Sequence, residues 1–229
     1  MATALNPLRL LVRPSKSPNL PVAPSQYSPQ YTDQLTNILR LYFSQVDNVS
    51  NAVLGVNGGL YLQNPHIAAQ NNVTQYALGD DTPTQILFNE LDSISGFTLD
   101  PTGYAQADQS GVYKVDYSLQ LANTDNVSHD VFVWLQTNGT LVPGSSSRFT
   151  IPARKSAGVF GYITAYSSVE FEIAKDDEIR LWWATEKAAT SGGTLGVYMP
   201  ALPAQTLPYP RPENPSAVGS INFVSRLPT

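Results

Sequence analysis

The stretch GVYKVDYSLQL, residues 111–121, decides how this chain folds. Large apolar side chains occupy every second position of it: Tyr113, Val115, Tyr117, Leu119 and Leu121. Successive side chains of a β-strand point to opposite faces, so one face of this segment is apolar while the other is mostly polar. The pattern predicts a strand that lies with one side against a core.

The same alternation recurs downstream, in VEFEIA (169–174) and in EIRLWW (178–183). Typical turn sequences separate the apolar runs: DPTG at 100–103, Asn138–Gly139, PGSSS at 143–147, Asp176–Asp177 and SGG at 191–193. About eight to ten short strands between residues 73 and 199 favour a mainly β domain, an antiparallel two-sheet jelly roll. There is no alternation of helices and strands that would support an α/β fold.

One strand differs from the others. In HDVFVWLQ, residues 129–136, Val131, Val133 and Leu135 form one face, and large aromatic residues form the other. A strand that is apolar on both faces is covered on both, either within its own domain or by another subunit. Three interpretations stay open for the surplus aromatic residues: core filling, a trimer interface, or a platform on which carbohydrate stacks. The candidate trimer-interface residues among the surplus aromatic residues are Phe132 and Trp134 of this strand and Trp182 of the segment 178–183.

Residues 31–54 are predicted to form one α-helix that precedes the jelly roll, with Thr32 as its cap. Its apolar residues follow the 4–3–4–3 spacing of a heptad seam, which needs a partner to cover it. That partner is either the protein's own domain or the helices of a short parallel bundle. The candidate trimer-interface residues on this seam are Leu35, Leu39, Tyr42, Val46 and Val49. Residues 55–72 are predicted to be a linker.

Both ends of the chain are rich in proline, with 13 of the 18 prolines in the first 30 and last 30 residues. Proline fixes φ and removes a backbone donor, so residues 1–30 and 200–229 are predicted to be extended arms. They are either disordered linkers or segments that lie along a neighbouring protein. The first arm is basic, and the candidate residues that would anchor it to such a neighbour are Leu8, Arg9, Leu10, Leu11 and Arg13.

The composition argues against catalysis. Cysteine is absent, charged residues make up 14% of the chain, and the two histidines are interpreted as incidental surface residues: His66 and His129. Adjacent acidic residues such as Asp80–Asp81 are interpreted as solvated turn charges. We therefore expect no enzyme activity, no cofactor and no metal. No apolar run approaches the roughly 18 residues of a membrane span, the start does not read as a signal peptide, and three basic residues in the first arm make nucleic acid a poor partner.

The body resembles a known family. SGVYKVDYSLQLAN (110–123), VFVWLQTNGT (131–140) and DDEIRLWWA (176–184) are similar in order and spacing to the jelly roll of complement globular heads and tumour-necrosis-factor-like proteins. The resemblance covers residues 73–199 and implies a homotrimer. The helical segment YTDQLTNILRLYFSQVDN (31–48) resembles a segment of virion structural proteins of tailed bacteriophages.

Together these features predict a homotrimeric structural virion protein that decorates or cements a phage capsid. Its partners would be the major capsid protein or other virion proteins, and its location the capsid exterior. The alternative is a host-recognition module on a tail or head fibre that binds a host surface glycan. No nucleic acid and no membrane is expected as a partner in either case.

Overall fold

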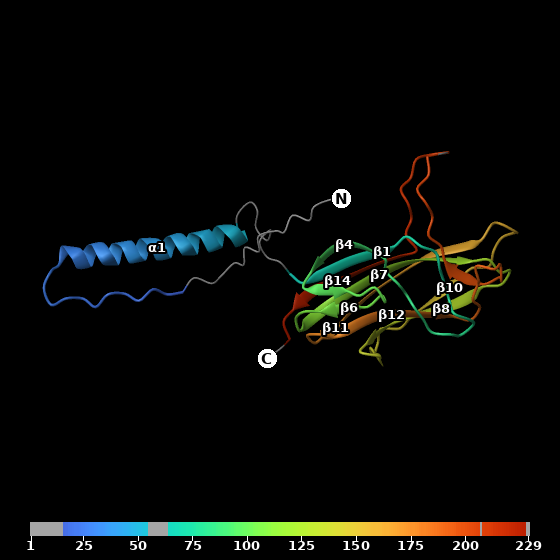
Figure 1. The fold of residues 1–229 in the computed structure, drawn as a ribbon, viewed down its shortest axis with the longest axis horizontal. Coiled ribbons are helices and arrows are strands. Elements are labelled where there is room, and N and C mark those ends of the chain that lie inside the picture. Colours follow the sequence, from blue (N-terminus) through green and yellow to red (C-terminus); the bar gives the residue numbers. More distant parts are fainter. Residues whose placement is uncertain (1–15, 55–63, 207, 228–229) are drawn as a thin grey trace. The chain divides into compact units, whose positions relative to one another are not determined.

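The computed structural model describes residues 16–54, 64–206 and 208–227 (Figure 1). The candidate anchoring residues of the first arm lie outside these ranges. The chain divides into two compact units, Met1–Gln63 and Asn64–Thr229, which are described separately. Among residues 16–54, regular structure is confined to one helix, and residues 16–28 before it contain neither helix nor strand.

Helix α1 (Pro29–Leu54) begins two residues before the predicted start, and its cap is Ser28, not Thr32. The amide of Tyr31 donates to Ser28 Oγ over 3.4 Å. Proline suits the first helical position because its missing N–H would have no helical acceptor there and its φ already matches the helix. Thr32 lies inside the first turn instead, where its hydroxyl donates back to Ser28 O over 3.3 Å.

The second unit is a sandwich of two antiparallel sheets, as predicted (Figure 1). The β7 sheet contains, in spatial order, β2 (Gln75–Tyr76), β13 (Val197–Met199), β7 (Gly111–Asn123), β14 (Ala217–Ser225), β1 (His66–Asn71) and β4 (Glu90–Ser95), with β11 (Gly161–Ile173) also paired to β7. The β8 sheet contains β10 (Ser147–Ile151), β8 (His129–Thr137), β12 (Glu178–Thr185), β6 (Ala105–Ala107) and β5 (Phe97–Leu99), with β3 (Thr84–Gln85) paired to β12 and β9 (Thr140–Leu141) paired to β8.

The boundaries of this domain are wider than the predicted 73–199. Strand β1 lies in the segment expected to be a linker, and β14 lies in the segment expected to be a proline-rich tail. Strand β14 is central to its sheet, because it pairs with β7 at eight positions and with β1 at six. The sequence has no proline between Pro215 and Pro228, so residues 217–225 keep every amide that a central strand needs.

The rest of the predicted tail, residues 200–216, forms a proline-rich loop that projects from the sandwich between β13 and β14 (Figure 1). Its two sides are joined by reciprocal backbone hydrogen bonds between Leu202 and Asn214, at 2.8 and 2.9 Å, and between Gln205 and Arg211, at 3.0 and 3.1 Å. Six prolines between residues 200 and 216 restrict the backbone of this segment. The segment is therefore a constrained two-sided ribbon instead of an extended arm.

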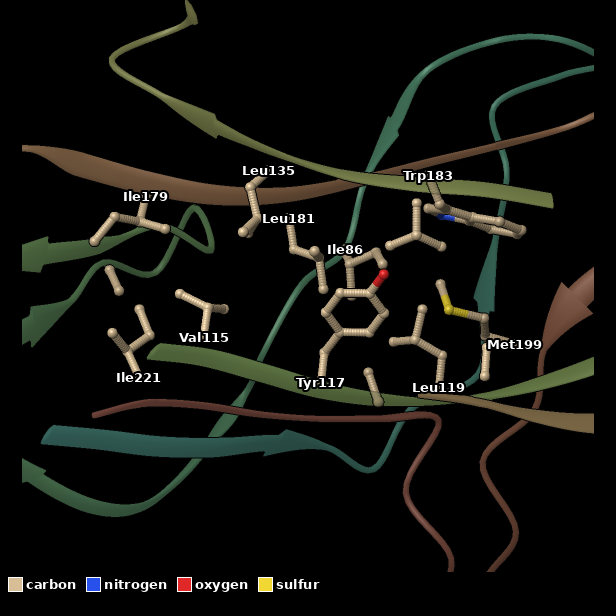
Figure 2. Packing of buried hydrophobic residues seen from close by; sticks show 14 of the residues in the cluster. Ile86, Val115, Tyr117, Leu119, Leu135, Ile179, Leu181, Trp183, Met199 and Ile221 are labelled. Carbon is tan, nitrogen blue, oxygen red and sulfur yellow. The ribbon is translucent and has the colours of Figure 1, made fainter. Parts of the chain in front are cut away.

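The core lies between the two sheets (Figure 2). The alternate residues predicted from the β7 sequence point into it, and Tyr113 and Tyr117 are at most 2% exposed. Tyr113 meets Phe223 of β14 edge-on, with ring centroids 5.5 Å apart. A Cβ on Gly111 would lie 2.6 Å from a ring carbon of Phe223, so the close approach of β14 to the start of β7 requires glycine there.

Candidate interaction surfaces

The two apolar faces of strand β8 lie in different environments. Val131 and Val133 are fully buried between the sheets, whereas Phe132 is 41% exposed and Trp134 is half-buried. Phe132 and Trp134 therefore lie on the outer side of the β8 sheet. The expectation that this strand is covered on both faces is not met within the sandwich, because the second face looks outward.

The neighbouring strands place more aromatic and cationic residues on this outer side. In the register of β8 and β12, Trp182 lies opposite Trp134 and Arg180 lies opposite Gln136. In the register of β10 and β8, Arg148 lies opposite Phe132. We define the aromatic face as the outer-side residues Tyr104, Phe132, Trp134, Arg148, Arg180 and Trp182.

Both guanidinium groups of the aromatic face are held over rings. The guanidinium carbon of Arg180 lies 4.6 Å from the centroid of Tyr104, and its nitrogens donate to Gln85 Oε1 and Glu178 Oε2, each over 3.0 Å. The guanidinium carbon of Arg148 lies 6.0 Å from the centroid of Phe132. Contacts of this kind keep a cationic side chain in one orientation.

Arg148 also pairs with Asp130, which is 8% exposed. The Thr150 hydroxyl donates to the other carboxylate oxygen of Asp130 over 2.6 Å. These hydrogen bonds, that of Thr150 first and that of Arg148 second, lower the pKa of Asp130. The carboxylate is therefore charged at neutral pH, and its ion pair with Arg148 helps to hold the Arg148 side chain in place.

The two outward indoles present carbon and not nitrogen to the exterior. The Nε1 atoms of Trp134 and Trp182 are both covered and have no hydrogen-bond acceptor. Both residues are nevertheless half-buried as a whole. Since the polar atom of each indole is covered, the side-chain surface that remains accessible is hydrocarbon.

The helix carries the other candidate interface. Its five seam residues, Leu35, Leu39, Tyr42, Val46 and Val49, are all half-buried. Two further apolar residues are more exposed, Leu41 at 65% and Phe43 at 59%. The five predicted residues thus share one stripe of the helix, whereas Leu41 and Phe43 lie to the sides of that stripe.

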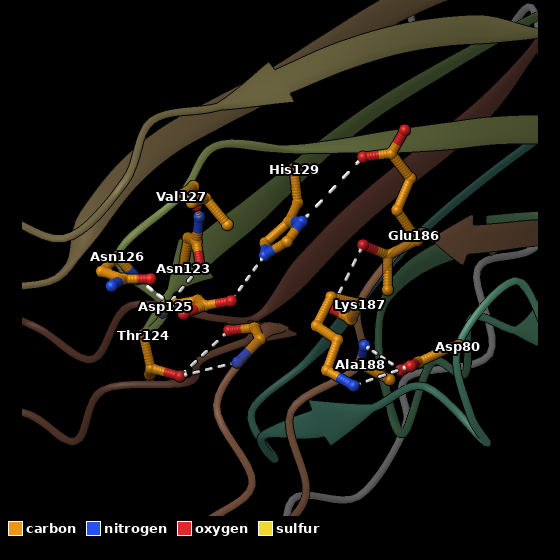
Figure 3. Close-up of polar contacts among 12 residues, drawn as sticks. Asp80, Asn123, Thr124, Asp125, Asn126, Val127, His129, Glu186, Lys187 and Ala188 are labelled. Carbon is orange, nitrogen blue, oxygen red and sulfur yellow. Dashed lines mark hydrogen bonds and ion pairs between the residues drawn. The ribbon is translucent and has the colours of Figure 1, made fainter.

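His129 is not the incidental surface residue expected from its sequence context (Figure 3). Its side chain is 11% exposed and lies between two carboxylates, with Nε2 2.9 Å from Asp125 Oδ2 and Nδ1 3.9 Å from Glu186 Oε2. The hydrogen bond to His129 is the main cause that lowers the pKa of Asp125, and the amide of Asn126 adds to it. No local motif signals this cluster, because Glu186 reaches His129 only through the pairing of β12 with β8.

The acidic pairs named from the sequence stabilise turns. Asp80 accepts from Lys187 Nζ over 2.8 Å and from the amide of Ala188 over 2.9 Å (Figure 3). Asp177 accepts from the amide of Ala174 over 2.8 Å and from Asn138 Nδ2 over 2.7 Å. Each carboxylate faces donors and not a second carboxylate.

In the described residues no helix combines the length and apolar character needed to cross a membrane. The same residues contain no group of three or more histidine and acidic side chains arranged to hold a metal ion.

No protein-family model and no curated protein matches the sequence. Solved structures similar to this chain include the globular domain of a zebrafish complement 1qA protein, with a TM-score of 0.39 and 13% identity over 72% of this chain and 100% of that one. Another is the Eiger TNF from S. frugiperda, with a TM-score of 0.40 and 9% identity over 72% of this chain and 96% of that one. Identities this low transfer no functional residue to this chain, so the proposals below rest on its own geometry.

Proposed function

We propose that this protein is a structural component of a tailed-phage particle, a homotrimer that decorates or cements the capsid. The observation that carries the self-assembly is the apolar seam of helix α1. The phage assignment rests on the resemblance of residues 31–48 to virion structural proteins. The protein has a building role in this proposal and carries out no reaction.

The charges of the helix support pairing with other helices. Its three charged residues, Asp33, Arg40 and Asp47, recur every seven residues and therefore share one side of the helix, away from the seam. The seam itself has neither charge nor proline from Leu35 to Val49. Residues spaced in heptads meet the same residues of a parallel copy turn after turn, so copies of α1 cover the seam.

Three helices fit this stripe better than two. Ile38 flanks the seam on one side and Phe43 on the other, and Phe43 is 59% exposed. A pair of helices covers mainly the seam, whereas a third helix also covers apolar residues at its flanks. The helix has 26 residues, and its seam from Leu35 to Val49 spans about 21 Å at the usual rise of 1.5 Å per residue, which gives the bundle about two heptads of contact.

The sandwich supplies a rigid body for such a particle protein. It has its own continuous core, so it keeps its shape whichever faces are covered by neighbours. The proline-rich loop at 200–216 and the first arm are its candidate contacts with the capsid lattice, since an extended segment can lie along a large surface of a partner. The aromatic face stays a second candidate for contact between copies.

The histidine cluster fits a structural role too. Catalysis by an Asp–His pair needs a nucleophile or an activated water placed by the imidazole. Both ring nitrogens of His129 face carboxylates instead, and within the described ranges no serine or threonine hydroxyl is hydrogen-bonded to it. The cluster connects β8 to Glu186, which follows β12, and to Asp125 in the loop between β7 and β8.

Light scattering coupled to size exclusion tests the self-assembly. Three chains of 24.9 kDa give a particle of about 75 kDa. A monomer of 24.9 kDa at micromolar concentration would end the proposal, and a dimer would overturn the trimer.

Labelling of intact particles tests the location. An antibody against the sandwich should decorate the outside of phage heads produced from the genome that encodes this chain. Absence of the chain from purified particles would overturn the virion role, whereas labelling of the tail alone would overturn the capsid location.

A further inference from the structure

The outer sides of the two sheets differ in composition. On β7 the outward residues are polar, namely Lys114, Asp116, Ser118 and Gln120. On the β8 sheet the corresponding side is the aromatic face, with four rings on two neighbouring strands, β8 and β12, and the segment before β6. Exposed rings contribute nothing to the core, and the β7 sheet has two as well, Tyr162 and Tyr166 on β11. The aromatic face differs because its rings lie beside two guanidinium groups, and this combination makes it a candidate ligand site.

We propose that the aromatic face is a binding site for a neutral polysaccharide, whose sugar rings stack on Trp134, Trp182 and Phe132. This proposal is independent of the trimer and of the capsid role. It assigns the chain a ligand class, and it would give the particle a means of adhering to a glycan-covered surface.

The accessible part of the two indoles suits stacking. Their nitrogen atoms are covered, so the outward surface offers carbon and π-electrons and no donor. A pyranose ring has a face lined with C–H groups, which pack against the electron-rich face of an aromatic ring. Because Trp134 and Trp182 are directly opposite in the register, their rings are cross-strand neighbours about 5 Å apart at Cβ.

Polar groups surround the rings at the positions where sugar hydroxyls would lie. Arg180 and Gln136 form the next cross-strand pair along β12 and β8 after Trp182 and Trp134. Gln85 lies opposite Trp182 on β3. A guanidinium group donates several hydrogen bonds in one plane and a carboxamide both donates and accepts, which fits vicinal hydroxyls.

These polar groups are already oriented. Arg180 is stacked on Tyr104 and bonded to Glu178 and Gln85, as described above. Gln85 is in turn held by a bond of its Nε2 to Thr102 O over 2.9 Å. A ligand that meets pre-oriented groups loses less binding free energy to the ordering of side chains.

The charges around the face select a neutral ligand. The two cations, Arg148 and Arg180, are each paired with a carboxylate, Asp130 and Glu178. The local charge therefore sums to zero, and a phosphate or an acidic polymer gains nothing from it. Aromatic residues and arginine are also common at the centres of protein–protein interfaces, so a second copy of the chain is the competing occupant of this face, and the light-scattering measurement below distinguishes the two.

The test uses the full chain and three neutral probes: cellohexaose, chitohexaose and maltohexaose. Binding is followed by tryptophan fluorescence and by calorimetry. The chain has three tryptophans, and Trp183 is fully buried, so a sugar-induced change in emission reports on Trp134 and Trp182. We expect at least one probe to bind with a Kd in the micromolar to low millimolar range.

The variants Trp134→Ala and Phe132→Ser should weaken that binding at least tenfold, and Arg180→Lys should weaken it severalfold because it keeps the charge but loses the planar fork. Phe132 is 41% exposed, so its replacement tests the face even if Trp134→Ala does not fold. The matched control is Tyr162→Ala, which removes an aromatic side chain that is 57% exposed on β11 of the other sheet.

Three results would overturn the proposal. The first is no response to any probe at 10 mM. The second is equal loss of binding in Tyr162→Ala and Phe132→Ser. The third is a change in the light-scattering mass of Phe132→Ser or Trp134→Ala, which would make the aromatic face an interface between copies of the chain.

Discussion

Helix α1 and the sandwich differ in how far their large apolar side chains are buried. The sandwich buries its large apolar residues against its own chain, so Trp183, Tyr113 and Leu119 have no exposed surface. The residues of the helix seam are only half-buried, and Phe43 stays 59% exposed. A segment of one helix has no second layer to pack against, whereas two sheets supply each other's cover. The difference supports the proposal that the body folds around its own core and that the helix associates with other helices.

The largest effect is expected from the core of the sandwich. Trp183→Ala should lower the free energy of unfolding by about 3–5 kcal/mol, because it leaves a cavity between the sheets. The neighbouring change Trp182→Ala removes the same side chain from the outer side of the same strand and should cost about 1 kcal/mol or less. Urea unfolding of both variants measures the two costs. Equal costs would show that the outer side of β12 is buried as deeply as the inner side.

The second prediction concerns the helix alone. Leu39→Asp places a charge in the seam and should cost about 2–3 kcal/mol per chain of association free energy, because three carboxylates would meet in one layer. The particle should fall from the trimer mass to the monomer mass in light scattering, while the urea midpoint of the sandwich stays unchanged. Arg40→Ala, one residue along and off the seam, is the control and should keep the trimer. A loss of sandwich stability in Leu39→Asp would contradict the separation of the two units.

The third prediction uses the pKa of Asp130. Because hydrogen bonds lower it below the value of 3.8 in the unfolded chain, the carboxylate contributes stability above that pH. The contribution should disappear as the pH falls through the lower pKa of the folded state. We expect a loss of about 1 kcal/mol from this group. The variant Asp130→Asn should show a correspondingly weaker loss of sandwich stability between about pH 5 and pH 2. The urea midpoint as a function of pH measures it, and identical pH profiles for both proteins would contradict the assignment.

The smallest effect is expected from a cavity of about 50 Å³ in the core of the sandwich. Its lining includes Ala105, Val115 and Leu181, which are apolar. Ala105→Val should fill part of this space and raise the free energy of unfolding by about 0.5–1 kcal/mol. Thermal unfolding measures the gain. A lower melting temperature would show that the strand cannot take the added methyl groups without strain.

Much of the sandwich was predictable, because the alternation of apolar and polar residues indicates which side of each strand is buried. The alternation of Tyr113, Val115 and Tyr117 fixes which side of β7 faces the core, and the turn at Asn138–Gly139 has the left-handed backbone that its sequence predicts, with φ of 51° and 77°. The predicted limits of the jelly-roll domain, residues 73–199, were wrong where the alternation of apolar and polar residues is weak. In β14 the alternation is interrupted at Gly219, where a Cβ would lie 2.9 Å from a ring carbon of Phe88, and the prolines just before the strand suggested an arm.

The candidate sites also combine features that the sequence predicts with features that depend on the pairing of distant strands. The seam of α1 follows from spacing alone, and so does the placement of Phe132 and Trp134 on one side of their strand. The cation that stacks on Tyr104 does not follow from spacing, because Arg180 and Tyr104 are brought together by pairing of strands far apart in the sequence. The position of His129 between Asp125 and Glu186 depends on the same long-range pairing.

By itself, the sequence determined the periodicities of this protein: a period of two over the strands and of three and a half over the helix. Those periods settle which side of each element is apolar, since side-chain direction is a local property of the backbone. Only the tertiary structure decided which elements meet, and with it the membership of β1 and β14 in the sandwich. It also decided that the surplus aromatic residues lie outside, because the space between the sheets is already filled by the alternate side chains of the same strands.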